Sequence, residues 1–179
     1  MTTVTKVFWL FGRSGAGKTT LARHLREALL TRGIPVINLD GDEMRATLCA
    51  DLGFGPEARL ENHRRIAETA RLMTGQGFNT VVSTMAPEYQ QRDLVARILG
   101  EKLVWLFIDA PLSVCMARDP KGIYRRAQAG QLGLLIDYPF HDPRPDELKN
   151  RVSTVMQTVE ESNQVILQIA KSHLNDFSI

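Results

Sequence analysis

The chain has 179 residues, enough to bury one hydrophobic core and too few for two ordinary domains, so we expect a single domain spanning residues 1–179. Its composition is 44% apolar and 23% charged, which is typical of a globular protein and excludes a fibrous or disordered chain. The formal net charge is only +2, and no basic stripe carries interleaved aromatic residues. We therefore expect neither nucleic acid nor a membrane as a partner.

Two features predict a cytoplasmic protein. The first residues lead directly into an apolar run without the charged region and long hydrophobic region of a signal peptide, and no apolar run reaches membrane-spanning length. Cys49 and Cys115 lie in apolar stretches with no neighbouring Cys or His at metal-ligand spacing. This spacing favours two separate reduced thiols over a disulfide or a zinc site.

Apolar periodicity predicts strands that alternate with helices along the chain. The expected strands are 7–11, 35–39, 80–82 and 103–108, and the expected helices are 17–32, 57–74, 89–99 and one that follows the capping box Thr158-x-x-Glu161. Runs that are apolar at consecutive positions belong in a sheet that is covered on both faces. The pattern predicts a three-layer α/β fold with a central, mostly parallel sheet flanked by helices.

Residues 119–147 interrupt this alternation. The segment is rich in proline, glycine and basic residues. Long irregular segments in compact domains are usually functional or mobile. We expect a mobile lid at approximately 119–147.

A phosphate-binding motif follows the first expected strand. Residues 12–19 read Gly-Arg-Ser-Gly-Ala-Gly-Lys-Thr and fit G-x-x-x-x-G-K-[ST], with a strand before them and a helix after them as the motif requires. Lys18 would reach the β- and γ-phosphates of ATP, and the Thr19 hydroxyl would hold Mg²⁺. The residues expected to bind ATP are Gly12, Ser14, Gly15, Ala16, Gly17, Lys18, Thr19 and Thr20. The motif identifies the expected architecture as the P-loop NTPase fold.

Two aspartates follow the second expected strand. Asp40 and Asp42 would lie at the carboxyl edge of the sheet, near the γ-phosphate. A carboxylate there can orient or deprotonate an acceptor hydroxyl and can help to hold the metal ion. The alternative is that either aspartate caps the helix expected to start near Glu43.

Two other classes of P-loop protein fit poorly. A guanine-specific GTPase needs an N-K-x-D segment, which the sequence lacks, and a mechanical ATPase is expected to have a strand ending in Asp-Glu. The strand 103–108 is followed instead by Asp109-Ala110-Pro111. The sequence therefore favours a kinase that phosphorylates a small-molecule hydroxyl, with charge neutralised by Lys18, Mg²⁺ and lid cations.

Beyond the phosphate loop, further segments resemble one family over most of residues 6–130. They are Leu39-Asp40-Gly41-Asp42 with Arg45, Asp51 to Phe54 followed by Arg59, Glu61-Asn62 and Arg64-Arg65, Ala86-Pro87 with Arg92, and Cys115 leading to Arg118-Asp119-Pro120-Lys121-Gly122-Ile123-Tyr124. The last segment resembles the family's distinctive R-D-P-K-G-L-Y. The chain resembles adenylylsulfate (APS) kinase, which transfers phosphate from ATP to the 3'-hydroxyl of adenosine 5'-phosphosulfate.

The resemblance implies roles for the matching residues. Asp42 would be the base or hydroxyl-orienting residue, and Phe54 would form one face of a clamp on the acceptor's nucleobase. Cationic forks suit the acceptor's phosphosulfate end, which Arg45, Arg59 and Asn62 would hold. The remaining expected contacts are Asp40, Met85, Ala86 and Lys121 on the acceptor side and Arg118 on the ATP side, with Lys18, Asp42 and Lys121 as the catalytic residues. The resemblance also implies a homodimer.

For some other residues the sequence leaves both a functional and a structural interpretation open. Arg64 and Arg65 would either act in the site or form the solvated face of a helix. Phe54 could be a core aromatic residue, although its place between Gly53 and Gly55 favours an accessible ring. None of the four histidines has ligand spacing, so none is assigned chemistry.

The sequence departs from the family pattern at the acceptor end. The family carries Ile-Ser-Pro where this chain has Met85-Ala86-Pro87, so the serine hydroxyl is absent. At 128–141 Gln128 replaces an arginine, and no aromatic residue stands at the second clamp position unless Tyr138 or Phe140 reaches it. Loss of a stacking face would cost about 1 kcal/mol of base binding.

Three functions remain from the sequence. The first is phosphorylation of the 3'-hydroxyl of APS by ATP. The alternative is a related kinase that acts on the ribose hydroxyl of another nucleotide, such as cytidine diphosphoramidate, which the altered clamp would favour. The third is a regulatory protein that binds ATP without transferring phosphate, which has no need of a hydroxyl-activating carboxylate at Asp42.

Overall fold

A computed structural model describes residues 4–131 and 140–174 of the chain. The strands are β1 (Val7–Phe11), β2 (Val36–Asp40), β3 (Asn79–Thr84), β4 (Leu103–Asp109) and β5 (Arg151–Ser153). The helices are α1 (Lys18–Thr31), α2 (Gly41–Ala46), α3 (Pro56–Gly75), α4 (Tyr89–Leu99), α5 (Leu112–Arg118), α6 (Ile123–Gln128) and α7 (Val159–His173), with a short 3-10 helix at Gly100–Lys102.

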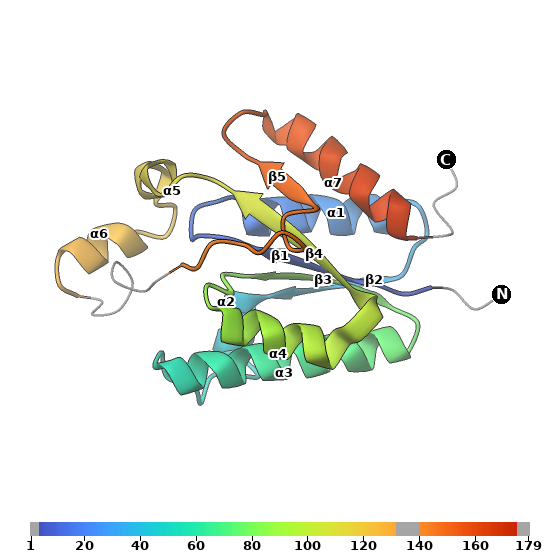
Figure 1. Cartoon of the computed structure of the whole chain (residues 1–179), viewed down its shortest axis with the longest axis horizontal. Helices are drawn as coiled ribbons and strands as arrows, with labels where there is room; N and C mark the ends of the chain where they lie inside the picture. The colour runs from blue at the N-terminus through green and yellow to red at the C-terminus, as the bar shows by residue number, and fades with distance from the viewer. Residues whose placement is uncertain (1–3, 132–139, 175–179) are drawn as a thin grey trace.

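The strands form one sheet in the order β2-β3-β1-β4-β5, and each of the four pairings is parallel. β1 is the central strand, and its last residue, Phe11, lies beside Thr84 of β3 and Phe107 of β4. Parallel strands place their carboxyl ends at one edge, and Figure 1 shows α5 and α6 at that edge, with the described ends of the chain at the opposite side. This edge is where ligands of open α/β sheets bind.

Helices cover both faces of the sheet. Helices α1 and α7 lie on one face and α3 and α4 on the other (Figure 1). Side chains of β1 alternate between these layers: Phe8 and Leu10 pack with α1 and α7, whereas Trp9 and Phe11 pack with α3 and α4. All five residues of β1 are fully buried, which explains why the strand is apolar throughout. The predicted three-layer α/β fold is confirmed.

Most of the predicted elements are present within one or two residues of their expected bounds. The capping box before α7 is also present, because the Thr158 side chain accepts from the Glu161 N–H and the Glu161 carboxylate accepts from the Thr158 N–H. β5 and α6 are among the elements that were not predicted. β5 has three residues, too few for a periodic signal, and α6 lies in the segment expected to be irregular.

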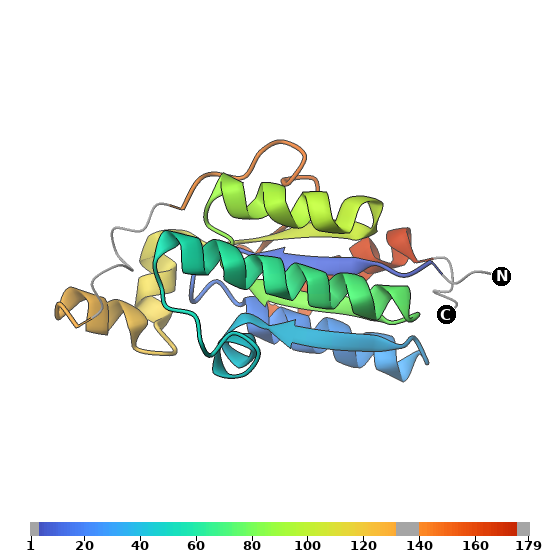
Figure 2. The ribbon, with the colours of Figure 1, turned by 90° about the horizontal axis from the view of Figure 1, so that it is seen from below.

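The prediction for the segment 119–147 is therefore corrected. It contains α6, and its described part from residue 140 packs against α4, where His141 N donates to the Pro87 carbonyl oxygen (2.9 Å). Figure 2 shows this orange segment passing over α4. The rest of the described segment is irregular, as predicted, and α6 was missed because short helices have weak local signals. Residues 132–139, including Tyr138, lie outside the described part.

Two further expectations concern the cysteines and the membrane. Cys49 and Cys115 are free and buried, as expected. Among the described residues, no helix has the length and apolar character needed to cross a membrane.

Candidate functional site

A cavity of about 630 Å³ opens at the carboxyl edge of the sheet. It brings together most of the predicted site residues: Ser14, Gly15, Gly17, Lys18, Thr19, Thr20, Asp40, Asp42, Arg45, Phe54, Arg59, Asn62, Met85, Arg118 and Lys121. Gly12, Ala16 and Ala86 are not part of its lining. Residues that the sequence placed in separate motifs thus share one cavity.

The phosphate loop between β1 and α1 depends on glycine. Gly15 has φ +79°, and a Cβ there would lie 2.8 Å from the Cys115 carbonyl oxygen. At Gly12, with φ +150°, an added Cβ would collide with the Ile108 carbonyl oxygen. Both positions therefore exclude a side chain, because the loop packs directly on the backbone of β4 and of α5.

Lys18 begins α1 and faces the inside of the phosphate loop. Its ammonium donates to the carbonyl oxygens of Gly12 (2.9 Å) and Arg13 (2.8 Å). Burial, followed by the positive charge of Lys121, lowers the pKa of Lys18 to about 8. A polyphosphate in the loop would favour the charged form of this lysine.

Asp40 is the centre of a hydrogen-bonded cluster. Its carboxylate accepts from the Thr19 hydroxyl (2.9 Å), the Ser83 hydroxyl (2.7 Å) and the Asp42 N–H (2.9 Å). The last bond makes Asp40 the N-cap of α2, so the capping alternative holds for this residue. Ser83, at the end of β3, was not singled out from the sequence, because only the register of β2 and β3 places it beside Asp40.

The same cluster has the chemistry of a Mg²⁺ site. Thr19 and Asp40 present oxygen atoms beside the phosphate loop, and oxygen is the ligand that Mg²⁺ prefers. In the described residues no group of three or more His, Cys, Asp and Glu could hold a metal by itself. The residues present fit a magnesium ion that completes its coordination with nucleotide phosphates and water.

Asp42 lies in the first turn of α2 and points into the cavity region rather than capping the helix. Its side chain is 68% exposed and forms an ion pair with Lys121, which lies between α5 and α6. The acidic and basic side chains that the sequence assigned to catalysis therefore face one another across the cavity.

The segment 118–124 is held against the phosphate loop by its own motif residues. Arg118 donates to the Gly15 carbonyl oxygen (3.4 Å) and to the Thr154 carbonyl oxygen (2.7 Å), and the Tyr124 hydroxyl donates to the Ser14 carbonyl oxygen (3.0 Å). The Asp119 carboxylate accepts from the N–H groups of Tyr124 and Arg125 at the start of α6 (3.1 Å each). These contacts explain which structural roles Arg118, Asp119 and Tyr124 have in this segment.

At the other end of the cavity an exposed aromatic ring is surrounded by cations. The ring of Phe54 is 60% exposed, which rejects the core alternative, and the Arg45 guanidinium lies 4.7 Å from its centroid. Arg59 Nε donates to the Phe54 carbonyl oxygen (2.7 Å). Asn62, one turn further along α3, is buried, and its Oδ1 atom has no protein partner among the described residues.

His63 is a lining residue to which the sequence assigned no role. Its Nδ1 atom donates to the Arg59 carbonyl oxygen (2.8 Å), and its ring stacks on Trp9 with centroids 6.3 Å apart. Burial lowers the pKa of His63 to about 4, so the ring is neutral at pH 7. Isolated histidines carry no spacing signal, so the sequence could not place it here.

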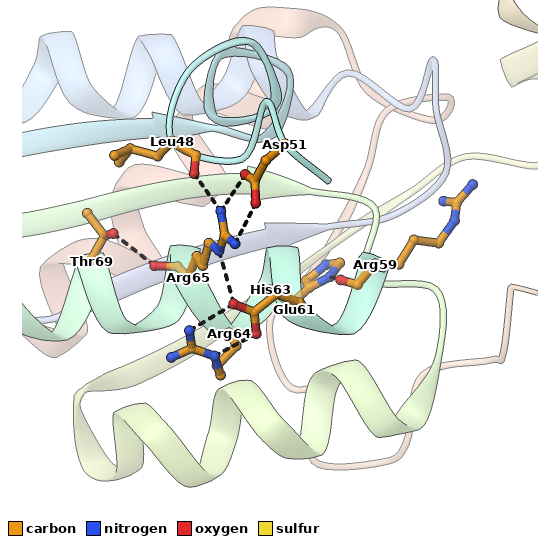
Figure 3. Close-up of polar contacts among 8 residues, drawn as sticks. All are labelled: Leu48, Asp51, Arg59, Glu61, His63, Arg64, Arg65 and Thr69. Carbon is orange, nitrogen blue, oxygen red and sulfur yellow. Dashed lines mark hydrogen bonds and ion pairs between the residues drawn. The ribbon is translucent and has the colours of Figure 1, made fainter. Parts of the chain in front are cut away.

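Arg64 and Arg65 lie outside the cavity lining. Figure 3 shows both side chains in a network of ion pairs: Arg64 binds Glu61 (2.7 Å), and Arg65 binds Asp51 (2.6 Å) and Glu61 (3.0 Å). Arg65 also donates to the Leu48 carbonyl oxygen (2.9 Å), which ties the loop after α2 to α3. The solvated-face alternative accounts for both arginines.

The described residues do not supply a second clamp face. Phe140 packs on Phe107 with ring centroids 6.4 Å apart, lies 4.8 Å from the Arg13 guanidinium and is absent from the cavity lining. Ala86 is fully buried, so its side chain does not reach the cavity, although its neighbours Met85 and Pro87 line it.

The sequence also missed one side of the cavity. Thr154, Gln157, Val159 and Ser162, around the loop between β5 and α7, line it beside Arg118. The Thr154 hydroxyl donates to the Ala16 carbonyl oxygen (2.9 Å), which links this loop to the phosphate loop. The capping box marks a helix start here but no binding function, because only the pairing of β5 with β4 brings the segment to the site.

A phosphate loop with its lysine and hydroxyl, opposed by a carboxylate at the carboxyl edge of a parallel sheet, defines a P-loop kinase. The family model for adenylylsulphate kinase matches residues 4–151. The chain belongs to the adenylylsulphate kinase family.

Individual relatives agree with this assignment. An adenylyl-sulfate kinase of Klebsiella pneumoniae is 47% identical over 145 residues, covering 79% of this chain and 72% of that protein. An adenylyl-sulfate kinase of Clostridium acetobutylicum is 38% identical over 169 residues, covering 93% of this chain and 84% of that protein. An APS kinase of Mycobacterium tuberculosis, solved in complex with AMPPNP and APS, superposes with a TM-score of 0.85 at 34% identity, covering 93% of this chain and 98% of that one.

Proposed function

We propose that the protein transfers the γ-phosphoryl group of ATP to the 3'-hydroxyl of adenosine 5'-phosphosulfate. The observation that carries the proposal is a single cavity with a complete phosphate loop beside Asp42 and an exposed Phe54 ring among arginines. Membership of the adenylylsulphate kinase family supports this choice of acceptor.

In the proposed reaction the acceptor's 3'-oxygen attacks the γ-phosphorus, and the bond between this phosphorus and the β,γ-bridging oxygen breaks. Asp42 orients the hydroxyl and accepts its proton, while Lys18 and Lys121 neutralise charge on the phosphates. Magnesium, held at Thr19 and the phosphates, would offset the negative charge of the triphosphate. Because Lys121 pairs with Asp42 in this structure, its ammonium can move from the carboxylate to the phosphates when both substrates are bound.

We place the substrates at opposite ends of the cavity. The ATP phosphates bind the loop of residues 12–20, with Arg118 beside the nucleoside. Asp40, Met85 and the arginines near Phe54 contact the acceptor, with Asn62 at its phosphosulfate end. Gly12 and Ala16 contribute to the loop through backbone geometry, and Ala86 acts through its neighbours.

The second candidate is a kinase for another nucleotide, such as cytidine diphosphoramidate. The packing of Phe140 away from the cavity favours it, because the described residues give the acceptor's base one aromatic face. A panel of acceptors, scored by ADP release, separates the two. Turnover of a cytidine compound with none on APS would reject the first candidate.

The role of Asp42 is tested by Asp42→Asn. We expect the rate of acceptor phosphorylation to fall by about 100-fold or more, because the amide cannot accept the proton, while ATP affinity measured by calorimetry is retained. An unchanged rate would remove Asp42 from its role. If the wild-type protein bound ATP but phosphorylated none of the acceptors, this result would support the third candidate function, a regulatory ATP-binding protein.

We also propose that the whole chain is one domain, that residues 119–131 belong to a lid while residues 140–147 anchor it on α4, and that the protein acts as a cytoplasmic homodimer. The homodimer is proposed from the resemblance to the APS kinase family carried by the sequence motifs. Sedimentation equilibrium tests the dimer.

A further inference from the structure

The most deeply buried ion pair among the described residues does not touch the cavity directly. Arg92 on α4 is 1% exposed and Glu147 is 2% exposed, and Arg92 Nε lies 3.0 Å from Glu147 Oε1. The guanidinium is packed between aromatic rings, 5.4 Å from the Phe11 centroid and 4.8 Å from the Tyr89 centroid. Burying two charges is costly, so the pair depends on good geometry and on further hydrogen bonds to its polar atoms.

The hydrogen bonds of Arg92 show which two backbone segments the ion pair joins. Nη1 donates to the carbonyl oxygens of Ala86 (3.0 Å) and Pro87 (3.5 Å), and Nη2 donates to those of His141 (3.2 Å) and Asp142 (3.4 Å). One planar fork therefore joins the turn after β3 to the returning segment that begins at residue 140. A lysine could keep the charge but could not reach both segments with fixed geometry.

The turn held by Arg92 has a strained backbone. Ala86 has φ +40°, in a region that residues other than glycine rarely adopt. Such strain persists only where the surroundings enforce it, and it concentrates at functional sites. The contacts that hold this turn include the bonds from Arg92 to the carbonyl oxygens of Ala86 and Pro87. Two backbone bonds add to them, from His141 N to the Pro87 carbonyl oxygen and from Gly12 N to the Met85 carbonyl oxygen.

The strained turn at Ala86 sets the positions of two residues that line the cavity. Met85 and Pro87 flank Ala86, and both line the cavity near Ser83 and Gln91. Arg92 itself is absent from the lining. The hydrogen bonds of Arg92 therefore connect the ion pair to the cavity through the backbone of residues 85–87, which we name the acceptor wall.

We propose that Arg92 and Glu147 are positioning residues that hold the acceptor wall in its active geometry. Glu147 fixes the guanidinium, and the guanidinium fixes the wall. The proposal rests on the proposed function only in taking this end of the cavity as the acceptor's site.

Two substitutions test the pair without removing its side-chain volume. Arg92→Lys keeps the charge and loses the fork, and Glu147→Gln keeps the shape and loses the charge. We expect each to lower kcat/KM for the acceptor by about 10- to 100-fold, since small misplacements at a reacting centre have effects of this size. The Kd for ATP, measured by calorimetry, should stay within about twofold, because among the described residues a single backbone hydrogen bond, from Gly12 N to the Met85 carbonyl oxygen (3.3 Å), joins the phosphate loop to the wall.

Asp93→Asn is the matched control. Asp93 and Arg144 form an exposed ion pair between the same two elements, α4 and the returning segment, and neither side chain bonds to the acceptor wall. This variant should retain the wild-type kcat/KM for the acceptor.

The outcomes separate positioning from general stability. Loss confined to the acceptor in both variants, with ATP binding retained, supports the proposal. Equal loss for ATP and acceptor, failure of both variants to fold, or wild-type kinetics in both overturns it. The kinetic comparison uses whichever nucleotide the wild-type protein phosphorylates, so inactivity on APS would reject the proposed function without affecting this test.

Discussion

Lys18 illustrates how a local motif acquires its chemistry from burial. The motif places an ammonium in the phosphate loop, but the lowered pKa of Lys18, about 8, comes from desolvation and from Lys121, more than 100 positions later in the chain. In this structure the ammonium is satisfied by two backbone carbonyl oxygens. Binding of a polyphosphate must therefore compete with these bonds and supply the missing counter-charge.

This gives a pH-dependent prediction for ATP binding. At pH 8 about half of the Lys18 side chains are neutral, and phosphate favours the charged form, so binding should take up about half a proton per ATP. At pH 7 the uptake should fall to about a tenth of a proton, since the lysine is already charged. Calorimetry in buffers of different ionisation enthalpy measures this uptake. Equal uptake at the two pH values would contradict the prediction.

At the scale of elements, the phosphate loop depends on close contact with α5. Gly15 lies against the Cys115 carbonyl oxygen with a positive φ, so both backbone conformation and space exclude a side chain. The motif alone shows that glycine is favoured here. The structure shows which neighbour requires it.

We predict that Gly15→Ala raises the Kd for ATP by about tenfold or more, because the strain of a left-handed alanine is about 1–2 kcal/mol before the clash is included. Gly75→Ala, at the end of α3, is the control, because a Cβ there meets nothing within 4 Å. Calorimetric titration with Mg-ATP measures both variants. If the two bound ATP equally well, the packing argument would fail.

At the scale of the whole molecule, His63 couples the α3 layer to the sheet and should limit stability in acid. It is buried against Trp9, and its folded pKa is about 4 against 6.5 for the free side chain. The unfolded chain therefore binds more protons than the folded protein between these two values. Stability must fall as the pH falls from 6.5 towards 4.

We expect the free energy of unfolding to drop by about 2–3 kcal/mol between pH 6.5 and pH 4.5 because of this group. His63→Leu should make the curve flatter in that window, whereas His24→Gln, at an exposed position on α1, should not change its slope. Urea denaturation at several pH values measures this. The lowered pKa of Glu61, about 2, adds acid sensitivity only below about pH 4.5, outside the window. An unchanged slope in His63→Leu would contradict the assignment.

The sequence by itself determined the features whose causes are local. Consecutive apolar residues predicted the buried strand β1, helical spacing predicted α1, and the glycine-rich motif between them predicted the phosphate loop and the class of protein. The resemblance identified the family through segments from which the structure gathers several residues, such as Asp42, Phe54 and Lys121, in one cavity. The catalytic and binding roles of Asp42, Phe54 and their neighbours stay predictions.

Only the tertiary structure decided the rest. Asp40 became a helix cap bonded to Thr19 and Ser83, and Arg65 became part of a surface network. The loop after β5 reached the cavity, and Arg92 reached the turn at Ala86. Most of these partners lie far along the chain or on another strand, and a hydrogen bond between distant segments has no periodicity or spacing that a single sequence can display. Arg92 and Ala86 are near in sequence, but the contact that ties them to residues 141 and 142 is equally invisible in the sequence.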